Sequence, residues 1–126
     1  MSDKFILMRK EKELLVYLEQ YVLNSLPKNE KVLRDNLTLE MYETIKNTAK
    51  VSMNKGNVRQ KYLNDVKVNI VMIDFYIGVA YSKNLVIKKR FLSCIKKMLF
   101  LITSSILSFL NKPLIFMSSL STQVSS

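Results

Sequence analysis

The amino-acid sequence predicts an all-α protein whose single domain, residues 1–112, folds as an antiparallel up-down-up-down four-helix bundle. Composition supports this fold, because helix-forming Leu, Lys, Ile and Glu are abundant while Gly and Pro occur only twice each among 126 residues. The residue pattern supports it too, since four segments place apolar residues at the three- and four-residue spacing of a buried helix face. The breaks between these segments are short, and short connections make neighbouring helices antiparallel.

The first two predicted helices meet at Pro27. The first spans roughly Lys4–Leu26 and stops at this proline, which cannot continue a helix. The second spans roughly Glu30–Met53, with Asn29 as its N-cap. The first helix has its apolar face at Leu7, Leu14, Leu15, Leu18, Tyr21 and Val22. The second has its apolar face at Leu33, Leu37, Met41, Ile45 and Ala49.

The other two predicted helices are separated by a short break at residues 82–84. Gly56 permits a left-handed turn before the third helix, and Asn57 caps that helix. The third helix is expected to bury Tyr62, Val66, Ile70, Ile73, Ile77 and Ala80. The fourth helix, which closes at Asn111 and Pro113, is expected to bury Leu92, Ile95, Leu99, Ile102, Ile106 and Phe109.

The sequence favours a cytoplasmic protein over a membrane-spanning or exported one. The uncharged run Met98–Leu110 is too short to cross a bilayer, which takes about 20 apolar residues. The N-terminal stretch lacks the apolar run and cleavage site of a signal peptide, and Cys94 is the single cysteine. Residues 113–126, a short apolar run followed by a Ser-rich end, are expected to form a disordered tail.

Positive charge is concentrated in the second part of the chain. The first 74 residues carry 13 basic and 10 acidic side chains, a net charge of +3. The last 52 residues carry seven basic and no acidic side chains, a net charge of +7. Such a field attracts polyanions, because Lys and Arg release counterions from a phosphate backbone on binding. A basic surface that is merely solvated is the alternative reading of this pattern.

The candidate nucleic-acid contacts lie on the third and fourth helices, where the sequence places no acid near the corner between them. RNA or DNA is expected to bind through its phosphates, with little base discrimination. Tyr62 and Tyr81 are expected either to stack on bases or to lie at the rim of the core. The candidate phosphate-binding residues are Arg59, Lys61, Lys83, Lys88, Lys89, Arg90, Lys96 and Lys97.

The sequence argues against an enzyme. It has no histidine, the usual general base and the commonest metal ligand. Gly56 and Gly78 are isolated and so form no phosphate-cradling loop. Cys94 is interpreted as an inert, half-buried thiol. We therefore expect no catalytic residue, metal, cofactor or small-molecule substrate.

The third and fourth helices are too apolar for a monomer, so a homo-oligomer built partly on them is expected. The third helix carries more apolar residues than one buried face can hold, and its surplus face is expected to meet another subunit. Asp74, on the same helix, is interpreted as pairing with a cation of another helix or subunit, with an exposed position as the alternative. The candidate oligomer interface consists of Val68, Val71, Met72, Phe75 and Tyr76.

Two segments resemble a known family. The string LPKNE at Leu26–Glu30 is similar to the family's FPK turn between its first two helices. The string IDFYIGVAYSKNLVIKKRF at Ile73–Phe91 is similar to its third-helix end, break and fourth-helix start. The family comprises the four-helix-bundle proteins of ribosomal RNA intervening sequences and the accessory variability determinant, Avd, of diversity-generating retroelements. The resemblance covers roughly Glu11–Lys112.

The resemblance implies a homo-oligomer, specifically a homopentamer, with a basic surface that binds nucleic acid without evident base specificity. It also implies a reverse transcriptase as partner. The chain departs from many relatives at two places. Asp74 and Gly78 stand where those relatives carry arginines, and Ile106–Phe109 replaces a Gly-Gly-Trp-like stretch.

Two other functions stay open at this point. The first is a homo-oligomeric protein-interaction scaffold whose basic face docks an acidic protein, with no direct nucleic-acid binding. The second is a helical protein that lies on an anionic membrane surface through its last two helices. The sequence favours nucleic-acid binding over both.

Overall fold

The chain is entirely helical over the residues that the structure describes. A computed structural model describes the backbone of residues 3–109 and the side chains of residues 6–103, and no strand occurs in that part of the chain. The all-α prediction is thus confirmed. The elements in order are α1 (Asp3–Tyr21), η1 (Leu23–Ser25), η2 (Lys28–Glu30), α2 (Lys31–Met53), α3 (Gly56–Ser82) and α4 (Lys88–Phe109).

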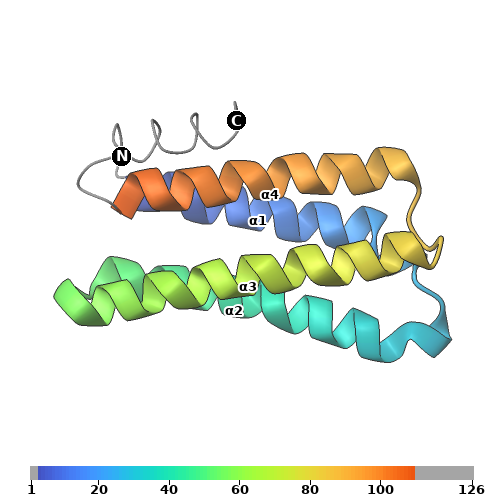
Figure 1. Cartoon of the computed structure of the whole chain (residues 1–126), viewed down its shortest axis with the longest axis horizontal. Helices are drawn as coiled ribbons and strands as arrows, with labels where there is room; N and C mark the ends of the chain where they lie inside the picture. The colour runs from blue at the N-terminus through green and yellow to red at the C-terminus, as the bar shows by residue number, and fades with distance from the viewer. Residues whose placement is uncertain (1–2, 110–126) are drawn as a thin grey trace, which may run out of the picture.

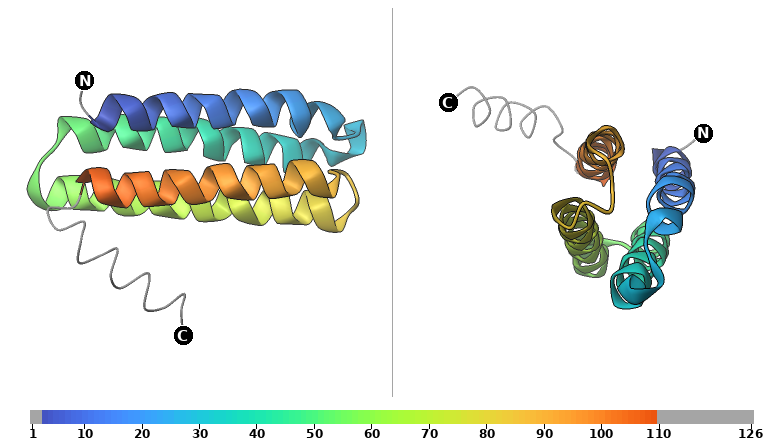
Figure 2. Two further views of the ribbon diagram at one scale, coloured as in Figure 1. Left: turned by 90° about the horizontal axis from the view of Figure 1, so that it is seen from above. Right: turned by 90° about the vertical axis from the view of Figure 1, so that its right-hand side faces the viewer.

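The four long helices lie side by side (Figure 1). Seen end-on in Figure 2, they occupy the corners of a quadrilateral in chain order, so that α1 and α4 are neighbours. The α1–α2 and α3–α4 connections lie at one end, and the α2–α3 connection lies at the other. The α2–α3 pair is packed most closely.

The first helix ends earlier than the sequence predicts. It stops at Tyr21, and two short 3₁₀ turns, η1 and η2, lead from there to α2. Pro27 lies between these turns with extended backbone, since its ring fixes φ and removes a donor. Asn29 does not cap α2: the N-cap position is held by Glu30, which makes no side-chain capping bond. Arg34 instead reaches back from α2 and donates a 2.6 Å hydrogen bond to the Leu26 carbonyl.

Both turns that flank α3 use left-handed backbone. Gly56 has φ +61°, as the sequence predicts, but α3 already begins there and Asn57 is not its cap. After α3, Asn84 also adopts φ 61°, a conformation that Asn tolerates better than most residues. The Leu85 amide then donates to the Ala80 carbonyl at 2.9 Å and closes the end of the helix.

The buried faces of α1 and α3 agree largely with the sequence pattern. Leu14 and Leu18 of α1 and Ile70, Ile73 and Ile77 of α3 are all at most 1% exposed. On α2 the buried positions differ from the predicted ones after Met41. Ile45 and Ala49 are only half-buried, and the buried positions further along α2 are Thr44, Asn47, Thr48 and Val51.

The predicted buried face of α4 is wrong by a rotation about the helix axis. Leu92 and Leu99 were expected in the core but are 51% and 59% exposed. Cys94, Met98 and Leu101 occupy the core instead. The error arises because Leu92 and Leu99 border the buried face, and adjacent apolar residues such as Met98 and Leu99 leave more than one choice of core position.

No helix in the described part of the chain has the length and apolar character needed to cross a membrane. Ile106 and Phe109, assigned to the core from the sequence, have side chains outside the described residues. The same holds for the predicted tail at residues 113–126.

Candidate nucleic-acid interface

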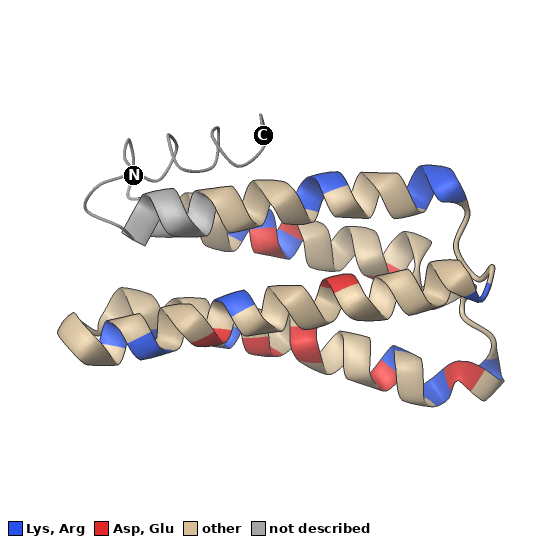
Figure 3. Ribbon diagram, in the orientation of Figure 1, with Lys and Arg blue, Asp and Glu red and all other residues tan. Residues whose placement is uncertain are grey.

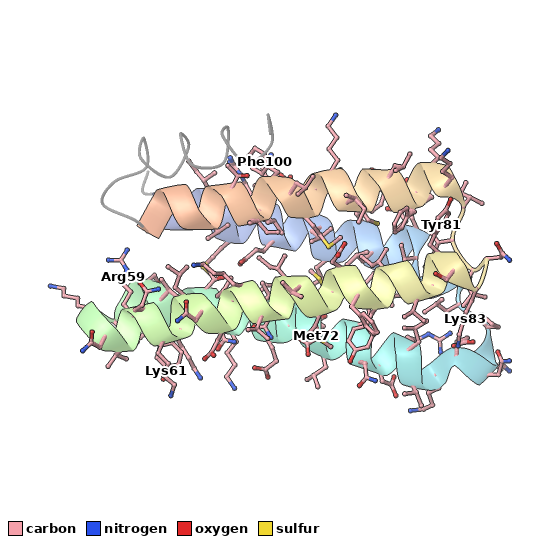
Figure 4. The ribbon with its side chains drawn as sticks, in the orientation of Figure 1. Arg59, Lys61, Met72, Tyr81, Lys83 and Phe100 are labelled. Atoms are coloured by element: carbon pink, nitrogen blue, oxygen red, sulfur yellow. The ribbon has the colours of Figure 1, made fainter. Side chains whose placement is uncertain are left out.

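The predicted basic corner between α3 and α4 contains an acid. Lys83, at the end of α3, forms an ion pair with Glu30 of η2 at 3.1 Å (Figure 4 labels Lys83). The expectation of an acid-free corner is therefore wrong. It fails because the α1–α2 connection folds back to the same end of the molecule as the α3–α4 connection. Lys83 is thus partly neutralised.

Arg59 and Lys61 do not join this corner. Figure 4 places both near the start of α3, at the opposite end of the molecule from Lys83. Arg59 is half-buried, and its Nε atom is buried. Lys61 is exposed, with its ammonium 5.5 Å from the centroid of the Tyr62 ring. The eight predicted contacts therefore do not form one cluster.

The strongest positive charge lies along α4. This helix carries five cations and no acidic residue, and Figure 3 shows it blue at its first turn and near its middle. Lys88, Lys89 and Lys96 are exposed, and no ion pair or side-chain hydrogen bond in the described part of the chain involves them. Lys89 and Lys96 are seven residues apart and so share one outward face. These lysines are free to meet a polyanion.

The other α4 cations face α1. Arg90 lies over the Tyr21 ring at 3.8 Å from its centroid, and Lys97 lies over the Tyr17 ring at 4.9 Å. From the opposite helix, Lys10 lies 5.5 Å from the centroid of the Phe100 ring. Such cation–π contacts hold a cation against an aromatic face without removing its charge. We call this set the α1–α4 seam: Lys10, Tyr17, Tyr21, Arg90, Lys97 and Phe100.

The seam opens onto a small cavity. Its volume is about 120 Å³, and it is lined by Lys10, Glu13, Leu14, Lys97 and Phe100. A shallower depression of about 410 Å³ adjoins it on α1, where Arg9, Lys12 and Tyr17 contribute to the lining. The sequence did not single out Arg9, Lys10, Lys12 or Phe100, because the α1 cations are interleaved with acids. Only the packing of α1 against α4 brings them beside the basic helix.

The two tyrosines considered for base stacking both lie at the rim of the core. Tyr81 is half-buried and stacks on Phe91, with centroids 4.2 Å apart and planes 7° from parallel. Tyr62 is half-buried, and the ammonium groups of Lys50 and Lys61 lie 5.1 and 5.5 Å from the centroid of its ring. Because Phe91 occupies one face of the Tyr81 ring, Tyr81 is the poorer stacking platform.

The outer face of α3 is apolar and uncovered within the chain. Val68, Val71 and Phe75 are 60%, 60% and 58% exposed, and Met72 and Tyr76 are half-buried. Asp74 is exposed and belongs to no ion pair of the described residues, so its pairing with another helix of this chain is wrong. The alternative interpretation of Asp74, a solvated position, fits the chain as it stands.

Cys94 is fully buried rather than half-buried. Burial raises the pKa of its thiol to about 11, although the charge of Lys97 acts in the opposite direction. A thiol with this pKa is a poor nucleophile near neutral pH. Within residues 6–103, no three His, Cys, Asp or Glu side chains gather to hold a metal ion.

A buried carboxyl lies in the core between α1 and α2. Glu11 is 0% exposed, and burial raises its pKa from 4.5 to about 8, opposed by a hydrogen bond with Thr48. Thr48 Oγ1 lies 2.5 Å from Glu11 Oε2 and 2.9 Å from the Thr44 carbonyl oxygen. One hydroxyl hydrogen cannot serve both acceptors, so the protonated carboxyl supplies the second hydrogen. Sequence analysis did not predict this buried carboxyl, because Glu is ordinarily a surface residue.

Comparison of the chain with protein-family models, with curated proteins and with solved structures found no match.

Proposed function

We propose that this chain is a non-catalytic nucleic-acid-binding accessory protein of the cytoplasm. The observation that carries the proposal is the charge of α4, a helix with five cations and no acid. Exposed lysines without protein partners bind phosphates at little cost, because no ion pair must first be broken. We also propose that the four helices form an antiparallel up-down-up-down bundle and that the chain belongs to the Avd-like family.

The phosphate contacts are assigned to the outward face of α4. Lys89 and Lys96 are separated by two helical turns, about 10 Å along the axis, so one nucleic-acid backbone can contact both. Lys88 lies at the N-terminal end of the same helix. Such contacts give affinity that falls steeply with salt and little sequence preference.

The proposal includes partners. The uncovered apolar stripe on α3 supports a homo-oligomer, since large exposed apolar patches are rare on monomers. The Avd-like resemblance adds a pentamer and a reverse transcriptase as partner. In that setting the basic helices of several subunits would hold template RNA or product DNA for the polymerase.

A filter-binding titration with mixed-sequence RNA and DNA tests the proposal. The variant is Lys89→Glu/Lys96→Glu, and the matched control is Lys46→Glu/Lys55→Glu, which makes the same change in net charge at exposed positions of α2 and the α2–α3 connection. We expect the α4 variant to lose at least about tenfold in affinity at low salt, with a shallower salt dependence. The control should retain most of the wild-type affinity.

Two results would overturn the proposal. One is a wild-type protein that binds neither nucleic acid at low salt. The other is equal loss of affinity in the α4 variant and its control, because binding would then depend on net charge rather than on α4.

The second candidate function is a homo-oligomeric interaction scaffold without direct nucleic-acid binding. The exposure of Val68, Val71 and Phe75 favours it, because these side chains need a cover whether or not nucleic acid binds. Light scattering coupled to gel filtration tests this function. We expect Val71→Lys/Phe75→Lys to dissociate the assembly, and a wild-type monomer at micromolar concentration would exclude it.

A further inference from the structure

We propose that the α1–α4 seam binds single-stranded nucleic acid, with one base stacked on Phe100. This inference rests on the proposed function and names the form of nucleic acid that the protein prefers. The site differs from the outward face of α4, because it combines cations of two helices with an accessible aromatic ring.

The charges around the seam suit a phosphate backbone. Arg9 and Lys12 lie on its α1 side, and Lys97 lies on its α4 side. The acid among the residues lining the cavity is Glu13, which is already paired with Lys10 at 3.3 Å. The seam therefore retains a net positive charge on both flanks, as a strand-binding groove requires.

Phe100 provides the stacking surface. Its side chain is 51% exposed, although a ring of this size gains free energy from burial. Lys10 approaches the ring to 5.5 Å from the centroid, and Figure 4 places Phe100 on the side of α4 away from α3. A base that covers the exposed part of the ring would bury apolar surface and bring its phosphate towards the seam lysines.

The geometry favours a single strand over a duplex. The bases of a double helix are already stacked and paired, so they cannot reach a ring that adjoins a cavity of about 120 Å³ between two helices. A single strand can splay one base into this space. Every base offers an aromatic face, so the site should tolerate any sequence.

Fluorescence anisotropy with labelled oligonucleotides tests the inference. The probes are oligothymidylate of about 20 nucleotides and a duplex of equal length, long enough to cover one small domain. Phe100→Leu removes the ring but keeps an apolar side chain, and Phe100→Tyr keeps the ring. Tyr42→Leu is the matched control, since Tyr42 is an aromatic residue of α2 with 53% exposure.

We expect Phe100→Leu to weaken binding of the single strand by about tenfold and to leave the duplex affinity unchanged. Phe100→Tyr and Tyr42→Leu should bind the single strand like the wild type. Unchanged single-strand affinity in Phe100→Leu, or equal weakening for single strand and duplex, would overturn the seam assignment while leaving the proposed function intact. A wild-type protein that binds neither probe would instead overturn the proposed function itself.

A competition experiment excludes a different occupant. Polyglutamate presents regularly spaced anions but no bases, so it should displace the single strand only weakly. If polyglutamate binds as tightly as the oligonucleotide and Phe100→Leu affects neither, the seam is a site for acidic protein segments and the inference is wrong.

Discussion

The buried carboxyl of Glu11 should make the stability of this protein fall as the pH rises. In the unfolded chain Glu11 ionises near its ordinary pKa of 4.5, whereas in the folded protein burial raises the pKa to about 8. Between these two values the folded state holds one more proton than the unfolded state. The free energy of unfolding therefore decreases by about 1.4 kcal/mol for each pH unit in this interval.

The size of the effect follows from the two pKa values. The interval between 4.5 and about 8 corresponds to about 5 kcal/mol, a large part of the stability of a small domain. This stabilisation is fully present below pH 4.5 and is lost as the pH rises through about 8. Glu11 Oε1 is buried and has no hydrogen-bond partner among the described residues. The ionised form is unfavourable because this oxygen would carry charge without solvation.

Glu11→Gln isolates this contribution. Its amide nitrogen can donate to Thr48 Oγ1 as the protonated carboxyl does, but it does not titrate. We expect wild type and variant to unfold with similar free energy at about pH 5, and the variant to be more stable by several kcal/mol at about pH 9. Guanidinium denaturation followed by far-UV circular dichroism at several pH values measures the difference.

A second variant separates burial from net charge. Glu43→Gln removes a carboxylate from a half-exposed position on α2, so it changes the net charge without removing the buried carboxyl. The reasoning would be refuted if the difference in unfolding free energy between wild type and Glu11→Gln stayed constant across this pH range.

Three further predictions concern the interior and the turns. Asn69→Ala should lower the thermal midpoint by several degrees. Asn69 links Asn47 of α2 to Glu40 through two 2.8 Å hydrogen bonds, and leaving both partners without a hydrogen bond should cost about 1–3 kcal/mol of stability. An unchanged midpoint in a thermal melt would contradict this. Cys94 should react with a thiol reagent at pH 8 only after denaturation, since it is buried with a pKa of about 11; rapid labelling of the native protein would show otherwise. Gly56→Ala should lower the free energy of unfolding by about 1 kcal/mol, measured by denaturant titration. The loss should come from backbone strain at φ +61° alone, because no atom lies within 4 Å of the added methyl group. A variant as stable as the wild type would contradict this.

The helices and most of the core could be predicted because local spacing determines them. On α1 and α3 the three- and four-residue steps identify the core positions, so Leu18 and Ile73 were placed in the core correctly. On α4 the apolar residues Met98 and Leu99 are adjacent, and the choice between them depends on how α4 packs against α1 and α3. Tertiary packing alone decides such a case.

The candidate site was less predictable because it depends on which helices become neighbours. The ion pair between Glu30 and Lys83 joins residues 53 positions apart, which no local pattern reports. The seam likewise requires α1 beside α4. The separation of Arg59 from Lys83, however, could have been calculated from the sequence, since 24 residues of helix extend over about 36 Å.

The short connection between α2 and α3 affects the order in which the fold assembles. Only Asn54 and Lys55 separate these helices, so little chain entropy is lost when they meet. Contacts between α1 and α4 join opposite ends of the chain and close its longest loop, so we expect them to form last and to open first. The α1–α4 seam, which we assign to single strands, is then also the first part of the fold to open. A bound strand would contact both helices and slow their separation.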